Sequence, residues 1–74
     1  MPAQLLATPA IDLLDHLRAL YVERALAAIE GLVSDSAYAA DLEDEISSCR
    51  AAYVGAAVIE IATLRAQLSA PLVG

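Results

Sequence analysis

Apolar residues recur at helical spacing in two segments of this 74-residue chain. In each segment they follow three- and four-residue steps, which place them on one face of a helix. The first face comprises Ala10, Leu14, Leu17, Tyr21, Ala25, Ala28 and Leu32, with a second stripe of Val22, Leu26, Ile29 and Val33 beside it. The second face comprises Leu42, Ile46, Cys49, Tyr53, Ala57, Ile61, Leu64 and Leu68. No alternating pattern indicates a strand, so we expect an all-α, two-helix antiparallel hairpin.

Capping residues place the ends of the first helix. Thr8 is a good N-cap and Pro9 suits the first helical position, so the helix should run from about residue 9 to 30. Gly31 is a suitable left-handed residue just after the helix, and Leu32 could then fold back onto its last turn. If the helix continues through Gly31, Ser34 would mark its end. We expect residues 1–8 to form a loose leader.

Two starts are open for the second helix. The segment 34–36 (Ser-Asp-Ser) carries turn and capping residues, whereas Asp41 begins a variant capping box that ends at Asp44. From either start the helix should continue to about Ser69 and stop before Pro71. The hairpin domain therefore covers residues 9–70, with 71–74 as a tail. The second helix should be longer than the first and extend beyond it.

Residues 51–59 contain no charge, so this part of the second helix has no polar face. A hairpin offers only one neighbouring helix to cover such a run, and an all-round apolar helix needs more. We therefore expect two hairpins to dimerise into a four-helix arrangement, with small residues allowing a close crossing. The predicted dimer interface comprises Ala51, Ala52, Tyr53, Gly55, Ala56, Val58 and Ile61. The alternative is that these small residues pack against the first helix of the same chain.

Composition supports association and restricts the possible partners. The chain is 59% hydrophobic with one cysteine and one histidine, and a core of this size supplies only ~3–5 kcal/mol without staples or oligomerisation. Its net charge of −6, with no lysine, disfavours nucleic acid and anionic membranes and favours a protein with a basic surface. The N-terminus lacks the pattern of a secretory signal, and a lone cysteine suits a reducing compartment. We expect a cytoplasmic protein.

An acidic cluster near the predicted hairpin tip is the candidate partner-binding site. It consists of Asp41, Glu43, Asp44 and Glu45, and Tyr38 beside it is an aromatic residue of the kind enriched at binding hot spots. The functional interpretation is a docking patch for a basic surface. The alternative is a solvated face whose charges favour a helix N-terminus.

The sequence contains no credible catalytic or metal-binding set, so we expect no enzyme and no cofactor. His16 has Asp12 and Asp15 nearby but no visible third ligand, which favours a surface ion pair over a metal site. The serines lack a glycine-rich loop and a second domain that would form a cleft. Cys49 lies on the apolar stripe as a small core residue, although at a dimer axis it could meet its twin. Arg24, Arg50 and Arg65 have no obvious partner at helical spacing.

Residues 17–26 (LRALYVERAL) and 52–61 (AYVGAAVIEI) resemble small early proteins of temperate phages, in particular those of the anti-quorum-sensing anti-activator type. The resemblance covers about residues 14–68 and rests on size, acidity and helical pattern. It implies a dimeric helical hairpin in the host cytoplasm that binds a LuxR-type transcription regulator and blocks DNA binding. A pilus-assembly ATPase is a second target that it implies. No residue role is carried over, because no motif aligns.

These observations favour a homodimeric protein-binding inhibitor that sequesters a host regulator. The alternative is a structural oligomerisation module, or a small subunit of a larger helical assembly, whose apolar surface a different chain covers. A soluble dimer would favour the inhibitor, and aggregation without a partner would favour the module.

Overall fold

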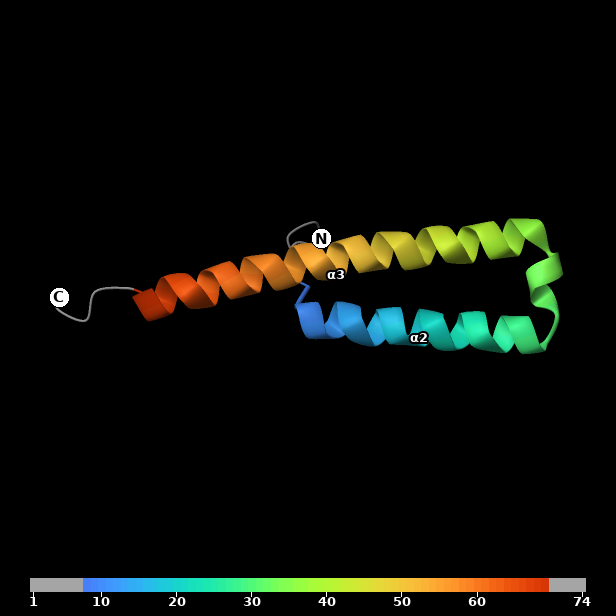
Figure 1. Cartoon of the computed structure of the whole chain (residues 1–74), viewed down its shortest axis with the longest axis horizontal. Helices are drawn as coiled ribbons and strands as arrows, with labels where there is room; N and C mark the ends of the chain where they lie inside the picture. Colours follow the sequence, from blue (N-terminus) through green and yellow to red (C-terminus); the bar gives the residue numbers. More distant parts are fainter. Residues whose placement is uncertain (1–7, 70–74) are drawn as a thin grey trace.

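Residues 8–69 of the computed structural model are described, and they form the expected antiparallel hairpin (Figure 1). Helix α2 (Ala10–Ile29) has 20 residues and helix α3 (Ser36–Ser69) has 34. A short 3₁₀ turn, η1 (Leu32–Ser34), joins them at the closed end of the hairpin. No strand occurs in the described part, so the all-α prediction is confirmed. Residues 1–7 of the predicted leader, Pro71 and the predicted tail lie outside it.

The ends of α2 follow the sequence expectations only in part. Pro9 is the N-cap residue, with extended backbone angles, and its side chain makes no cap hydrogen bond. The prediction of Thr8 as N-cap and Pro9 as first helical residue is therefore one position too early. At the other end, Gly31 has φ +75°, the left-handed conformation that stops the helix. Its amide donates to the carbonyl of Ala28 at 3.3 Å, and the continuous-helix alternative is wrong.

Asp35 determines where α3 begins. Its carboxylate accepts a hydrogen bond of 3.1 Å from the backbone N–H of Tyr38, three residues further along the chain. This is the geometry of a helix N-cap. Of the two predicted starts, the one at residues 34–36 is therefore correct. The capping box at Asp41 does not form an end, because α3 already runs through it. Helix α3 continues as far as Ser69, the last described residue.

The core is a narrow seam between the two helices. Its members are Leu17, Leu20, Leu42, Ile46 and Cys49, with Tyr21 and Tyr38 packed against it. On α3 the three buried residues, Leu42, Ile46 and Cys49, belong to the predicted stripe, whereas its members Ile61, Leu64 and Leu68 are exposed. On α2 the seam follows the alternating three- and four-residue steps of a coiled coil, which keep one face toward a partner helix. It consists of Ala10, Leu13, Leu17, Leu20 and Ala27.

The predicted face of α2 is therefore partly wrong. Ala25, Ala28 and Leu32 are exposed, whereas Leu20 and Ala27 are buried in their place. A helix has 3.6 residues per turn, so residues joined by repeated four-residue steps lie progressively further around its surface. Toward the closed end of the hairpin, the predicted stripe therefore no longer faces α3.

Ile46 is the side chain most completely enclosed by this seam, at 1% exposure. Replacing it with alanine leaves a cavity, and we expect a loss of about 2–5 kcal/mol, comparable with the whole stability of so small a core. Ile29→Ala is the matched control, because Ile29 is 78% exposed. Urea unfolding followed by circular dichroism should separate the two variants, and similar midpoints would contradict this position of the core.

Candidate functional site

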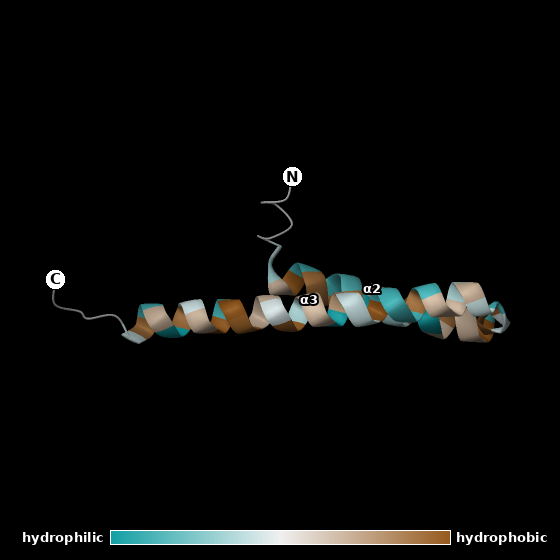
Figure 2. Cartoon of the chain, turned by 90° about the horizontal axis from the view of Figure 1, so that it is seen from above, coloured by the Kyte–Doolittle hydropathy of each residue, from teal (hydrophilic) through white to brown (hydrophobic). Residues whose placement is uncertain are grey.

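The C-terminal half of α3 carries a large exposed apolar surface. Figure 2 shows apolar residues along α3 where it continues past the N-terminal end of α2. We define the α3 apolar surface by its large side chains, each between 52% and 77% exposed: Val54, Val58, Ile59, Ile61, Leu64 and Leu68. Helix α2 has only 20 residues against 34 in α3. At ~1.5 Å per residue, roughly 21 Å of α3 therefore has no partner helix in the described part of the chain.

The size of this surface can be set against that of known interfaces. A standard complex buries about 800 Å² on each partner, and the six large side chains of the α3 apolar surface, each more than half exposed, are the part of the described chain that such an interface would cover.

Most of the small residues of α3 lie away from α2. Ala51, Ala52 and Gly55 are exposed, and a Cβ added at Gly55 would meet no atom within 4 Å. At these three positions the structure does not show the packing against the first helix that the alternative interpretation requires. Of the predicted dimer interface, Tyr53 and Ala56 are half-buried, and Val58 and Ile61 are 60% and 57% exposed in the single chain. The surface is available, and the dimer itself stays a prediction.

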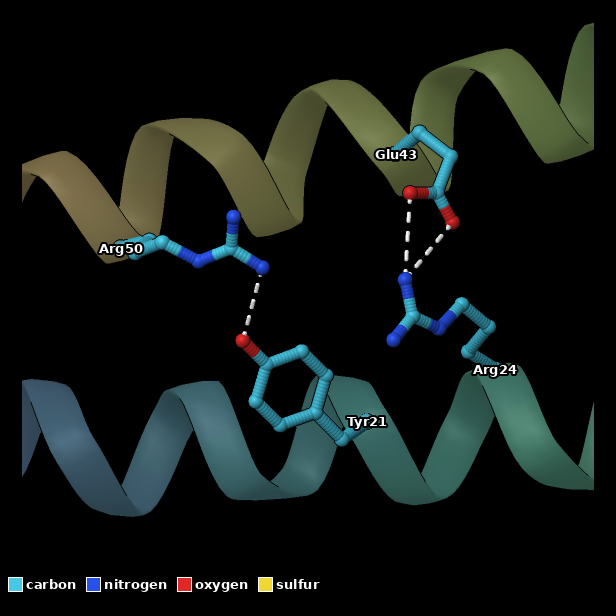
Figure 3. Close-up of polar contacts among 4 residues, drawn as sticks. All are labelled: Tyr21, Arg24, Glu43 and Arg50. Carbon is cyan, nitrogen blue, oxygen red and sulfur yellow. Dashed lines mark hydrogen bonds and ion pairs between the residues drawn. The ribbon is translucent and has the colours of Figure 1, made fainter.

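Two of the four clustered acids belong to contacts between the helices. Glu43 accepts hydrogen bonds from Arg24 Nη1 at 3.2 and 3.3 Å, one to each carboxylate oxygen (Figure 3). On the opposite flank, Glu45 Oε2 lies 3.5 Å from His16 Nε2. Asp41 and Asp44 are exposed and have no ion-pair partner among the described residues. The cluster is thus partly structural, and only these two aspartates remain free for a partner.

Arginines without a partner at helical spacing find one across the hairpin. Arg50 donates to the hydroxyl of Tyr21 at 2.9 Å, a contact that raises the pKa of Arg50 (Figure 3). The guanidinium of Arg24 lies 5.1 Å from the centre of the same ring, within cation–π range. Exposed contacts of this kind stabilise little individually, but together they favour one register of α2 against α3. Arg65 has no such contact in the described part.

Glu60 has a role that its sequence context does not reveal. It interrupts the apolar half of α3, and its Oε2 accepts a hydrogen bond of 2.7 Å from the backbone N–H of Ala10. A carboxylate at the N-terminus of a helix satisfies a free amide and interacts favourably with the helix dipole. Glu60 therefore caps α2 from 50 residues away, and no local spacing could have indicated it.

The cysteine and the histidine, which were considered for a disulfide and a metal site, both make contacts within the hairpin. Cys49 is buried in the seam, with its thiol 3.4 Å from the carbonyl of Leu13. It faces the inside of the hairpin, so the suggestion that it meets its twin at a dimer axis is wrong. His16 pairs with Glu45 rather than with Asp12 or Asp15. Within residues 8–69 no group of three potential ligands is placed to hold a metal ion.

Helix α3 is also long and apolar enough to cross a membrane by length and composition, with a mean hydropathy of 1.2 over its most apolar stretch. One such helix is weak evidence. Glu60 and Arg65 both lie in its apolar half, and each charge at the centre of a bilayer costs about 2.5–3.5 kcal/mol. The absence of membrane binding stays a prediction.

Comparison with known proteins gives no match: no family description fits the chain, and no curated protein or solved structure is significantly similar to it.

The cap formed by Glu60 can be tested with Glu60→Ala, which removes both the acceptor and the charge. We expect the free energy of unfolding to fall by about 0.5–2 kcal/mol and amide exchange in the first turn of α2 to become faster. Asp44→Ala is the control, because Asp44 caps no helix and makes no ion pair in the described residues. Urea unfolding and hydrogen exchange measured by NMR would check both. Unchanged exchange at the start of α2 in Glu60→Ala would contradict the capping role.

Proposed function

We propose that this chain is a non-enzymatic protein-binding module that acts as a homodimer. The observation that carries the proposal is the α3 apolar surface, whose six large side chains are each more than half exposed. Burying apolar surface stabilises by about 25 cal/mol per Å². A two-fold interface that buries about 800 Å² of each chain would therefore add substantially to the low stability of a two-helix core.

The small residues of α3 give this interface a place. Ala51 and Gly55 are four residues apart and lie on one exposed ridge, with Val58 beside it. Glycine inside a helix costs about 1 kcal/mol relative to alanine, and nothing within the hairpin compensates for it, because Gly55 has open space around it. Close approach of a second α3 would supply that compensation.

For the function of the dimer, we propose the sequestration of a basic protein surface. The net charge of −6 and the free carboxylates of Asp41 and Asp44 support a basic partner. The resemblance to phage anti-activators suggests the kind of partner, a LuxR-type transcription regulator whose DNA-binding surface is basic. An inhibitor of this kind would compete with DNA and require no catalytic residue.

The alternative is a structural module whose α3 apolar surface is covered by a different chain. The exposed surface supports this alternative equally, because its composition does not distinguish a second copy from another apolar helix. Solution mass distinguishes the two: a soluble dimer of the isolated chain favours the homodimer, and aggregation that a partner relieves favours the module.

Two substitutions test the dimer without damaging the hairpin. Ile61→Asp places a carboxylate on a side chain that is 57% exposed in the single chain, so the hairpin should stay folded. In a dry dimer interface the same carboxylate has a large desolvation cost. We expect a helical monomer by size-exclusion chromatography and circular dichroism. A dimer that persists in Ile61→Asp would contradict this interface.

Gly55→Leu is the second variant. It should raise the stability of an isolated hairpin and lower that of a dimer that crosses at this residue. Within the hairpin the new side chain meets no atom, and leucine is a better helix former than glycine, so an isolated hairpin should become more stable. At a close helix crossing it should overpack and cost about 1–3 kcal/mol. We expect weaker dimerisation by sedimentation equilibrium. A stabilised protein of unchanged mass would show that Gly55 lies outside any interface.

The docking role of the acidic cluster requires variants that leave the hairpin contacts intact. Reversing the charge of Glu43 would also break its ion pair with Arg24, so we choose Asp41→Lys with Asp44→Lys. Against the purified DNA-binding domain of a LuxR-type regulator, we expect weaker binding and a smaller salt dependence. Equal affinities for wild type and variant at two salt concentrations would place the contact elsewhere.

A further inference from the structure

A second apolar surface lies at the closed end of the hairpin, on the opposite end of the molecule from the free part of α3. It is a groove of about 340 Å³ formed by the second half of α2, η1 and the first turn of α3. We call it the closed-end groove. Its apolar floor includes Val22, Leu26 and Leu32, which are 58%, 55% and 50% exposed. Three large side chains half open to water in one groove form a surface that a partner can cover.

The rim of the closed-end groove is negatively charged. Glu23 and Glu30 both line it, seven residues apart on α2, which is two turns or roughly 10 Å along the helix. The last turn of α2 contains no basic residue, so the negative end of its dipole is not compensated there. The positive end of α3 lies at the same end of the hairpin, but the carboxylate of Asp35 already caps it. A cationic ligand is therefore favoured along this rim.

Tyr38 fixes part of the rim in place. Its hydroxyl donates to Glu23 Oε2 at 2.7 Å, across from α3 to α2. The charged acceptor raises the pKa of Tyr38, which keeps the phenol neutral and able to donate. Glu23 is thereby held with one oxygen on Tyr38 and the other free. The groove thus presents a positioned carboxylate at one point of the rim and the carboxylate of Glu30 two turns away.

We propose that the closed-end groove binds a basic amphipathic helix of the target protein. Such a helix would place apolar side chains on Val22, Leu26 and Leu32, and lysine or arginine residues seven apart beside Glu23 and Glu30. This is the helix-in-groove mode of recognition, with charges that set orientation and partner choice. The inference rests on the proposed protein-binding function and assigns the partner to a different surface from the dimer.

A second copy of this chain does not have the required complement. Its four cations are Arg18, Arg24, Arg50 and Arg65, and no two of them are seven residues apart. Three already contact groups within their own hairpin. The occupant is therefore a helix of another protein, richer in cations than this chain.

The test uses a synthetic leucine–lysine helical peptide about five turns long, with lysines spaced by seven residues, and a control peptide with glutamate in their place. We expect the basic peptide, but not the acidic one, to bind wild type in fluorescence anisotropy. Glu23→Gln with Glu30→Gln should weaken binding by roughly ten-fold. Asp12→Asn with Asp15→Asn removes the same charge from exposed positions of α2 outside the groove and should change the affinity by less than about two-fold. Leu26→Ser should also weaken binding, because it removes an apolar side chain from the floor of the groove.

Three other results would overturn the inference, and a fourth would support it without the dimer. Equal weakening by both charge variants would indicate non-specific attraction to an acidic protein. Conversion of the dimer to a monomer by Leu26→Ser would show that a second copy occupies the groove. If the wild type is dimeric but does not bind the basic peptide, the binding role of the groove is contradicted and the proposed dimer is not. A monomeric wild type that binds the peptide, with the pattern of variants above, supports the groove and removes the dimer.

Discussion

The unequal length of its two helices is the constraint on which the surface of this protein depends. The seam between α2 and α3 can be only as long as the shorter helix, which has 20 residues. Leu17, Leu20, Leu42, Ile46 and Cys49 fill that seam. Beyond it α3 continues with a more apolar composition but with no neighbouring helix among the described residues. A chain with little core and much exposed apolar helix is stabilised most effectively by association.

Polar contacts between the helices determine how the hairpin presents its surfaces. On one flank Arg24 contacts Glu43 and Arg50 contacts Tyr21, and on the other His16 lies against Glu45. Glu60 then joins α3 to the first amide of α2. Exposed pairs contribute little energy individually, but a shift in register would break all of them. They keep the α3 apolar surface at the open end and the closed-end groove at the other.

Sequence periodicity predicted the architecture and most of the α3 seam, because Leu42, Ile46 and Cys49 follow helical spacing and face one neighbour. It predicted the α2 face less well, since Leu20 and Tyr21 are both apolar and only the coiled-coil repeat selects Leu20. Contacts between distant residues could not be predicted. Glu43 resembles any member of an acidic cluster until Arg24 is placed opposite it. The groove could not be predicted either, because the spacing of Val22 and Leu26 indicates only a second apolar stripe on the first helix and does not show what lies beside it.

The central claim is that the C-terminal half of α3 is buried against a second copy in solution. Amide hydrogen exchange along α3, measured by mass spectrometry across a dilution series, tests it most directly. The account predicts protection of residues 54–69 at high protein concentration, comparable with that of the seam, and loss of this protection on dilution while the seam around Ile46 stays protected. Fast exchange in residues 54–69 at every concentration would contradict it.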